Sequence, residues 1–431
     1  MSLGPHPTNS ATPAPPVPTR IDLGDEPVVV HGATLGGLAV AARLAKQGHV
    51  VVLDAHGQRD GGHWAPREVQ EVLVDDLPQT FLLPAAWRDL FKKSGRAMDA
   101  ELTRHGLTLE PAPAQEHRFA DGRTLVLPAE RGDQFHAVED AFGRGAAERW
   151  RDVLDELDEV WQQLRLTGLE RRFEAAALDA RAKQKLLAGL TLEGLAERVQ
   201  DAHLGTIIRS QASLAGAPPG RAPALLAVRL AVHRRFGSWQ LLREGAPERA
   251  SAVVDLLTER AGLRGVQRTS HSGPTSATVE ARPQRPAGWL ARRSCPPALA
   301  PQVRQRIVEA TSDGIVERLD HRAGNPVVTW HRPLPDGRAV ETVHDHRTVR
   351  PDLAWGLAPA SFRAWRSRPG IRADEGWNAS CAQHAGNEPW AELLTAALVA
   401  YEVHEERTGE DIRPTNKTQP TPRRQARPAL S

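Results

Sequence analysis

Residues 28–54 read VVVHGATLGGLAVAARLAKQGHVVVLD. Three valines open the stretch, and a short β-branched run of this kind is typical of a strand buried on both faces. A glycine-rich turn follows at Gly32, and apolar residues then recur at helical spacing until Gly48, where a glycine suits the C-terminal cap of a helix. We therefore expect a strand, a helix that begins near Gly36, and a second strand that ends at Asp54.

The spacing of this stretch is that of a βαβ unit that binds an adenine dinucleotide. In such a unit the first glycine permits a tight turn, the second lets the backbone approach the pyrophosphate, and the third lets the helix pack against the strand. Gly32 and Gly37 stand at the first and third positions, whereas Thr34 stands at the second. We expect the Thr34 side chain to push the pyrophosphate outward or to require a shifted loop, while its hydroxyl could donate to a phosphate oxygen. Asp54 has the spacing of the acid that contacts the ribose. A βαβ unit kept as a scaffold after the loss of nucleotide binding remains the alternative.

The length and composition of the chain limit its domain number and its class of partner. The chain has 431 residues, 40% of them hydrophobic and 25% charged, with a formal net charge of +2. This length allows two domains or one large discontinuous domain, and the net charge predicts neither a nucleic-acid nor a membrane partner. Two cysteines supply no disulfide framework and no metal-ligand spacing, which favours a reducing cytoplasm. Residues 1–26 and 414–431 are rich in proline and polar residues, so we expect disordered tails, and no signal peptide or transmembrane span is predicted.

Further motifs follow the βαβ unit. Residues 54–66, DAHGQRDGGHWAP, supply Gly61 and Gly62, with His63 next to them, and residues 74–96 read VDDLPQTFLLPAAWRDLFKKSGR. These segments resemble the phytoene-desaturase branch of the flavin amine oxidase-like superfamily. That branch usually has arginine after the glycine pair and glycine where this chain has Leu77.

The resemblance extends over about residues 27–265 and again over about 340–413, while residues 266–340 are not placed by it. Residues 119–130, FADGRTLVLPAE, are similar to a β-hairpin of the family, with its turn at Asp121–Gly122. In the middle segment Glu244–Gly245 replaces a glycine pair that lies close to the flavin in that family. Near the C-terminus the 386–390 turn keeps only Gly386 of several expected glycines.

The resemblance implies an α/β fold: a discontinuous Rossmann-like FAD/NAD(P)-binding domain with an inserted α+β substrate domain. The dinucleotide-binding domain would comprise residues 27–75, 216–280 and 376–413. The substrate domain would comprise residues 76–215, with a helical insertion, and residues 281–375. The implied cofactor is FAD, and its expected contacts are Gly32, Ala33, Thr34, Leu35, Gly36, Gly37, Asp54, Ala55, Gly61, Gly62, His63 and Gly386.

Two functions of different classes remain open. The first is an FAD-dependent oxidoreductase, similar to phytoene dehydrogenases, that removes a hydride from a hydrophobic small molecule or isomerises it. The second is a non-catalytic, flavin-poor relative that acts as a binding or assembly protein. Since the flavin ring accepts the hydride in such chemistry, catalytic side chains are not identifiable by residue type, and we name none. The substrate, the electron acceptor and the oligomeric state are not predicted.

Three other patterns have structural interpretations. His344 and His346 lie two apart, which would place them on one face of a strand, but no further metal ligand is spaced to join them, so we expect an exposed polar strand and no metal site. Tyr401 and His404 are expected on a solvated helix face. Residues 137–165 form an amphipathic stretch that we interpret as core-packing helix, with peripheral membrane contact as the alternative.

Overall fold

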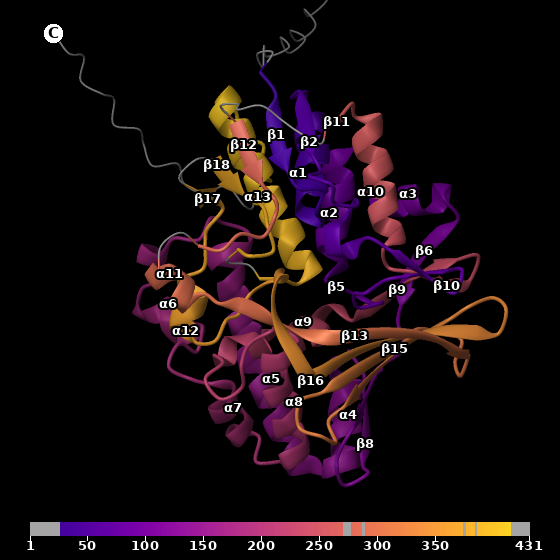
Figure 1. Ribbon diagram of the computed structural model, residues 1–431. Helices are drawn as coiled ribbons and strands as arrows, with labels where there is room; N and C mark the ends of the chain where they lie inside the picture. The colour runs from indigo at the N-terminus through magenta and orange to yellow at the C-terminus, as the bar shows by residue number, and fades with distance from the viewer. Residues whose placement is uncertain (1–25, 270–276, 287–288, 374–375, 384–385, 415–431) are drawn as a thin grey trace, which may run out of the picture.

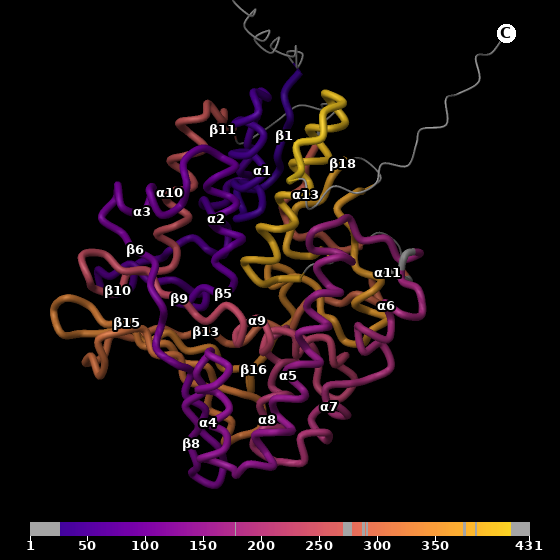
Figure 2. The backbone as a smooth tube through the Cα atoms, turned by 180° about the vertical axis from the view of Figure 1, so that it is seen from behind, coloured from indigo at the N-terminus to yellow at the C-terminus, as the bar shows by residue number. Residues whose placement is uncertain are grey.

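The computed structural model describes residues 26–414, apart from 270–276, 287–288, 374–375 and 384–385. The expected tails therefore lie almost entirely outside the described residues. The sheet that contains residues 28–31 and 51–54 occupies the upper part of Figure 1 and the helical region the lower part, with long antiparallel strands between them. Figure 2 shows the same division from behind.

The upper sheet has six strands in the order β11-β2-β1-β12-β18-β17. Its strands are β1 (Val28–His31), β2 (Val51–Asp54), β11 (Gln267–Thr269), β12 (Ala277–Glu280), β17 (Arg372–Ala373) and β18 (Gly376–Asn378). All neighbouring pairs are parallel except β17 with β18. The valines of β1 are almost fully buried, as the β-branched run predicts for a strand covered on both faces.

Helix α1 (Leu35–Lys46) follows β1 and packs against α10 (Ala252–Leu263), α13 (Pro389–Thr408) and α2 (Pro84–Ser94). The helix begins one residue before the expected Gly36, and Gly48 follows its last turn with φ +89°, in the conformation that favours glycine. A Cβ on Gly37 would lie 2.1 Å from the carbonyl oxygen of Gly32, so this position does require glycine, as the motif predicts. Gly32 itself has φ +104°.

Two further large sheets complete the β structure. A four-stranded sheet contains β5 (Phe81–Leu82), β6 (Leu107–Pro111), β9 (Ser238–Arg243) and β10 (Ala246–Glu248). A six-stranded sheet has the order β13-β16-β15-β14-β7-β8. Its strands are β7 (Gln115–Arg118), β8 (Thr124–Leu127), β13 (Pro297–Glu309), β14 (Val316–Asp320), β15 (Val327–Pro333) and β16 (Arg338–Leu357). Strands β7 and β8 form the hairpin expected around Asp121–Gly122. A small ribbon joins β3 (Arg67–Val69) to β4 (Val72–Val74).

The remaining helices lie mainly in the lower part of Figure 1. They are α3 (Met98–Arg104), α4 (Arg131–Phe142), α5 (Arg144–Leu164), α6 (Ala180–Lys185), α7 (Leu192–Arg198), α8 (Ala202–Leu214), α9 (Val228–Phe236), α11 (Trp289–Ser294) and α12 (Phe362–Arg366). Helices α4 and α5 cover the amphipathic stretch, and α5 buries a full apolar face that includes Trp150, Leu157 and Trp161. The core-packing interpretation of this stretch is therefore confirmed. No helix in the described part of the chain has the length and apolar character needed to cross a membrane.

Two expectations about exposed polar residues are wrong. His344 and His346 on β16 are buried. The His344 imidazole donates to the Asp76 carbonyl oxygen at 2.6 Å, so the loop at Asp76 covers His344. His346 instead interacts with the backbone of Ser213 on α8. On α13, Tyr401 and His404 are buried as well. The His404 ring contacts His49 at a nitrogen–nitrogen distance of 2.9 Å, so this side of α13 packs against the chain that follows α1.

Candidate functional site: the glycine-rich loop and its cleft

Thr34 is the N-terminal cap of α1. Its hydroxyl oxygen accepts a hydrogen bond from the Gly37 N–H at 3.2 Å, and the hydroxyl donates to the Ala281 carbonyl at 3.1 Å. The hydroxyl proton is thus directed toward the end of β12, and the expected donation to a phosphate oxygen is not supported. The Thr34 backbone has φ −68° and ψ 171°, an ordinary extended conformation, so the loop tolerates threonine without strain.

A buried carboxylate lies at the same helix end. Glu392, in the first turn of α13, accepts a hydrogen bond from the Gly36 N–H at 2.8 Å and also interacts with the Thr34 hydroxyl. Burial raises the pKa of Glu392 to about 7, although the hydrogen bond from the Gly36 N–H acts in the opposite direction. Two N–H groups of the first turn of α1 are therefore bonded to oxygens of the protein, at the place where a Rossmann unit presents N–H groups to a phosphate.

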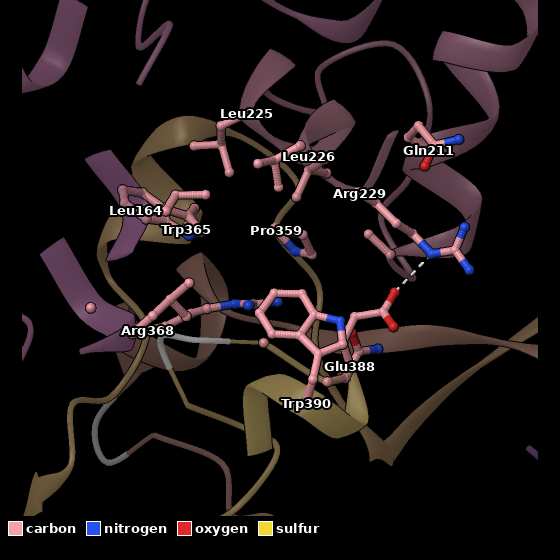
Figure 3. A pocket seen from close by; sticks show the side chains of 16 residues that line it. Leu164, Gln211, Leu225, Leu226, Arg229, Pro359, Trp365, Arg368, Glu388 and Trp390 are labelled. Carbon is pink, nitrogen blue, oxygen red and sulfur yellow. Dashed lines mark hydrogen bonds and ion pairs between the residues drawn. The ribbon is translucent and has the colours of Figure 1, made fainter. Parts of the chain in front are cut away.

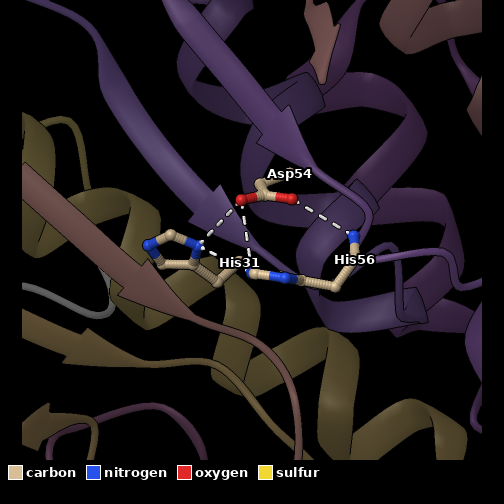
Figure 4. Close-up of side chains that lie close together, drawn as sticks. All are labelled: His31, Asp54 and His56. Carbon is tan, nitrogen blue, oxygen red and sulfur yellow. Dashed lines mark hydrogen bonds and ion pairs between the residues drawn. The ribbon is translucent and has the colours of Figure 1, made fainter. Parts of the chain in front are cut away.

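Asp54, the expected ribose contact, is buried at the end of β2 between two histidines (Figure 4). Its Oδ2 lies 3.5 Å from Nδ1 of His31 and 3.2 Å from Nε2 of His56. The other oxygen, Oδ1, accepts a hydrogen bond from the His56 backbone N–H at 3.2 Å. Ala55 stands between Asp54 and His56 in the sequence, and its N–H donates to the Thr269 carbonyl.

Beside the glycine-rich loop is a cleft of about 770 Å³. Three of the expected cofactor residues, Thr34, Gly62 and His63, line it together with Trp355. Ala33, Leu35, Gly36 and Gly37 are buried and do not line the cleft. This volume lies within the roughly 300–1,000 Å³ of typical small-molecule and cofactor sites.

Gly62, the second residue of the glycine pair, lines this cleft, and Gly61 holds its loop in place. Gly61 and Gly62 have φ +88° and +62°, and the Gly61 N–H donates to the Ala33 carbonyl at 2.7 Å, which holds the second loop against the first. A Cβ on Gly62 would lie 3.4 Å from the Thr34 side chain. Enclosure by surrounding atoms lowers the pKa of the adjacent His63 to about 4, with Asp352 acting in the opposite direction, so His63 is neutral at pH 7.

Arginines on the cleft walls supply positive charge. Arg59, Arg67 and Arg350 line the cleft. Arg67 pairs with Asp76 at 2.8 Å and Arg350 with Asp352 at 3.3 Å, and both acids also line the cleft. None of these arginines stood out in the sequence, because two of them come from β3 and β16, which only the fold brings to the glycine-rich loop.

A second, smaller pocket of about 90 Å³ is lined mainly by apolar side chains (Figure 3). Its wall includes Leu225, Leu226 and Trp390, and the Arg229 guanidinium donates to the Glu388 carboxylate at 3.0 Å on one side. Gly386, an expected cofactor contact, lines this pocket and not the cleft.

Asn387 lies between the apolar pocket and the cleft. It lines the apolar pocket, and its side-chain amide donates at 2.7 Å to the carbonyl of Trp355, which lines the cleft. The apolar pocket is therefore separated from the cleft by the 386–388 turn and β16.

One departure from the family pattern, Glu244, lies away from the cleft, whereas another, Leu77, lines it. Glu244 and Gly245 form the exposed turn of the β9–β10 hairpin, and neither lines the cleft, contrary to the position near the flavin that the resemblance implies. Asp75 is buried, and it accepts hydrogen bonds from the backbone N–H and the hydroxyl of Ser251, at the start of α10. Asp75 therefore anchors α10, whereas its neighbour Leu77 lines the cleft.

Comparisons with known proteins agree with this architecture. A family model described as an NAD(P)-binding Rossmann-like domain matches residues 30–94. The chain is 30% identical to hydroxyneurosporene desaturase of Cereibacter sphaeroides over 246 residues, which cover 55% of this chain and 48% of the relative. It is 29% identical to phytoene dehydrogenase of Streptomyces griseus over 206 residues, or 47% of this chain and 40% of the relative. These alignments thus span no more than about half the length of these curated relatives.

Among solved structures, putrescine oxidase in complex with putrescine aligns with a TM-score of 0.59. The alignment covers 88% of this chain and 98% of the oxidase, at 14% sequence identity. At this identity the likeness concerns the fold alone.

Proposed function

We propose that the protein is an FAD-dependent oxidoreductase that acts on a hydrophobic small molecule. The chain carries an NAD(P)-binding Rossmann-like domain, is distantly homologous to phytoene desaturases and has the fold of amine oxidase flavoenzymes, and these findings support the proposal. The observation that carries the proposal is the cleft of about 770 Å³, which adjoins the first glycine-rich loop and is lined by Thr34, Gly62 and His63. The flavin, when bound, accepts a hydride from the substrate.

The residues of the cleft suit a dinucleotide in shape and charge. Gly62 places no side chain in the cleft, and the Arg59 guanidinium on the cleft wall offers positive charge to a pyrophosphate. The neutral imidazole of His63 offers one N–H donor and one acceptor to a ligand. The apolar pocket near Trp390 is smaller than a complete ligand site and suits only an apolar part of a substrate.

A flavin-poor binding or assembly protein is the second candidate. The favouring observation is that the Gly36 and Gly37 N–H groups already have acceptors within the chain, in Glu392 and Thr34. If these contacts persist, the helix end offers less to a phosphate than it does in an ordinary Rossmann unit.

The test is the visible absorption spectrum of freshly purified protein, followed by titration with FAD and chromatography of the supernatant released by heat. We expect a flavin band, or binding of added FAD. Gly62→Asn should weaken binding about tenfold or more, because the new side chain projects toward Thr34 at the cleft mouth.

Gly57→Asn is the matched control. Gly57 also has positive φ, +74°, but a Cβ there meets no atom within 4 Å, and asparagine tolerates this backbone conformation. A colourless protein that fails to bind added FAD would overturn the proposal in favour of the binding protein. Equal FAD affinity in the two variants would show that the cofactor lies elsewhere.

A further inference from the structure

Three potential metal ligands meet at the carboxyl ends of β1 and β2. His31 is the last residue of β1, and Asp54, the last residue of β2, is its register partner in the parallel sheet. His56 follows two residues after Asp54, with φ +47°, which turns its side chain back over the strand ends. Figure 4 shows both imidazoles directed at the Asp54 carboxylate. Among the residues that the structure describes, this is the one cluster of three or more histidine, cysteine or acidic side chains with ligand atoms close enough for a shared ion.

The three ligand atoms form a nearly equilateral triangle. Oδ2 of Asp54 lies 3.5 Å from Nδ1 of His31 and 3.2 Å from Nε2 of His56, and the two nitrogens lie 3.3 Å apart. Atoms that bind one zinc ion at about 2.0–2.1 Å in tetrahedral directions lie about 3.3–3.4 Å from one another. The triangle therefore has the size of one face of a zinc coordination tetrahedron.

The surroundings hold the ligands in place and leave access for an ion. The His56 N–H binds Oδ1 of Asp54, which fixes the carboxylate and directs Oδ2 toward the imidazoles. The Asp54 side chain is 1% exposed, whereas the His31 and His56 side chains are 20% and 36% exposed, so an ion can enter from solvent. The nearby Arg282 guanidinium, which would repel a cation, is bound at 2.8 and 2.7 Å to the two carboxylate oxygens of Glu280.

We propose that His31, Asp54 and His56 bind a divalent ion of the zinc class, with the fourth coordination position open to water. Two imidazoles and one carboxylate suit zinc and its first-row neighbours better than magnesium or calcium, which prefer oxygen ligands. Because Asp54 has the place of the ribose acid in a dinucleotide-binding unit, ion and ribose compete for the same carboxylate. The site thus couples metal availability to dinucleotide binding.

The test uses the full-length protein after dialysis against a chelator and removal of any flavin. Titration calorimetry with Zn²⁺ should show one equivalent bound with a dissociation constant below about 10 µM. His56→Gln and His31→Ala should each weaken this binding about a hundredfold, since each removes one of three ligands. Cobalt(II) should give visible absorption bands of a tetrahedral ion in the wild type and lose them in both variants.

His136→Gln is the control, because His136 is 73% exposed on α4 and lies outside the cluster. Circular dichroism establishes that the variants are folded. Absence of a single site in the wild type, or equal zinc affinity in His56→Gln and His136→Gln, would overturn the proposal. The zinc isotherm is measured without flavin, so its result does not depend on whether the protein binds FAD. If the protein does bind FAD, one equivalent of Zn²⁺ should raise the apparent FAD dissociation constant at least about tenfold, and an unchanged constant would refute the competition.

Discussion

The side-chain oxygen Oε1 of Glu392 accepts a hydrogen bond of 2.8 Å from the backbone N–H of Gly36, across 356 positions of the sequence. The contact joins the first turns of α1 and α13, two helices that pack against each other. An acidic group from the chain itself is thus bonded at a helix end that favours anions. A phosphate that binds at this helix end therefore competes with the Glu392 carboxylate for the Gly36 N–H.

Glu392→Gln tests whether the carboxylate competes with a cofactor phosphate. Glutamine keeps the acceptor for Gly36 and removes the charge, so we expect FAD to bind roughly fivefold more tightly at pH 8, equivalent to about 1 kcal/mol of charge interaction at a helix end. At pH 5.5 the gain should disappear, because the pKa of Glu392 is raised to about 7 and the wild-type group is then protonated.

The same variant changes the pH dependence of stability. Between about pH 4.5 and 7 the folded wild type holds a proton that the unfolded chain has lost, so this group makes stability fall as pH rises. Glu392→Gln should remove this fall, which amounts to about 3 kcal/mol by pH 8. Urea unfolding at pH 5 and pH 8 measures it. A constant stability difference between the two proteins at both pH values would contradict the raised pKa.

Two substitutions of Thr34 test the effect of its methyl group and the effect of its hydroxyl separately. Thr34→Ser keeps the N-cap to Gly37 and the bond to Ala281 but removes the methyl that faces Gly62. Thr34→Val keeps the bulk and loses the cap, at a cost of about 1 kcal/mol in the free energy of unfolding. If the methyl narrows the cleft beside Gly62, flavin occupancy should rise in Thr34→Ser and not in Thr34→Val. A flavin occupancy of the valine variant equal to that of the serine variant would show that the methyl has no steric effect.

The βαβ unit could be predicted from sequence because its determinants are local. Valine runs, the helical spacing of alanine and leucine, and the steric requirement at Gly37 operate within residues 28–54, and the observed elements differ from the prediction by about one residue. The hairpin at Asp121–Gly122 was predictable for the same reason.

The chemistry around the unit was not predictable, because it depends on distant contacts. The Glu392 contact joins two helices from opposite ends of the chain. The approach of His31 to His56 depends on the register of β1 with β2 and on a left-handed turn at His56. The sequence did contain a signal for this cluster, because one histidine stands directly before Gly32 and another stands two residues after Asp54. The burial of His344 was missed since the sequence pattern of a strand does not show which loop covers it.

Buried neutral histidines should make the protein sensitive to acid. Burial lowers the pKa values of several histidines to about 4 or below. They are His49, His233, His321, His344 and His346. Below pH 6.5 the unfolded chain binds protons that the folded protein does not, so stability should fall from pH 6.5 to about 4, by up to about 1.4 kcal/mol per pH unit for each group.

The measurement is the free energy of urea unfolding between pH 4.5 and 7.5. His344→Gln can still donate to the Asp76 carbonyl but does not titrate, so its slope below pH 6.5 should be shallower than that of the wild type. The exposed His136→Gln serves as the comparison and should retain the wild-type slope. Identical slopes in all three proteins would refute the role assigned to His344.

The apolar pocket near Trp390 should accept an apolar chain if the substrate is hydrophobic. Ala215→Leu adds three carbons at the pocket wall, whereas Ala202→Leu adds the same atoms at the exposed start of α8. We expect short alkanes or alkanols to raise the melting temperature of the wild type and of Ala202→Leu, but not of Ala215→Leu, because ligands that bind only the folded state stabilise it. A shift of equal size in both leucine variants would place the alkyl site outside this pocket, and the pocket would then be only a packing defect beside the 386–388 turn.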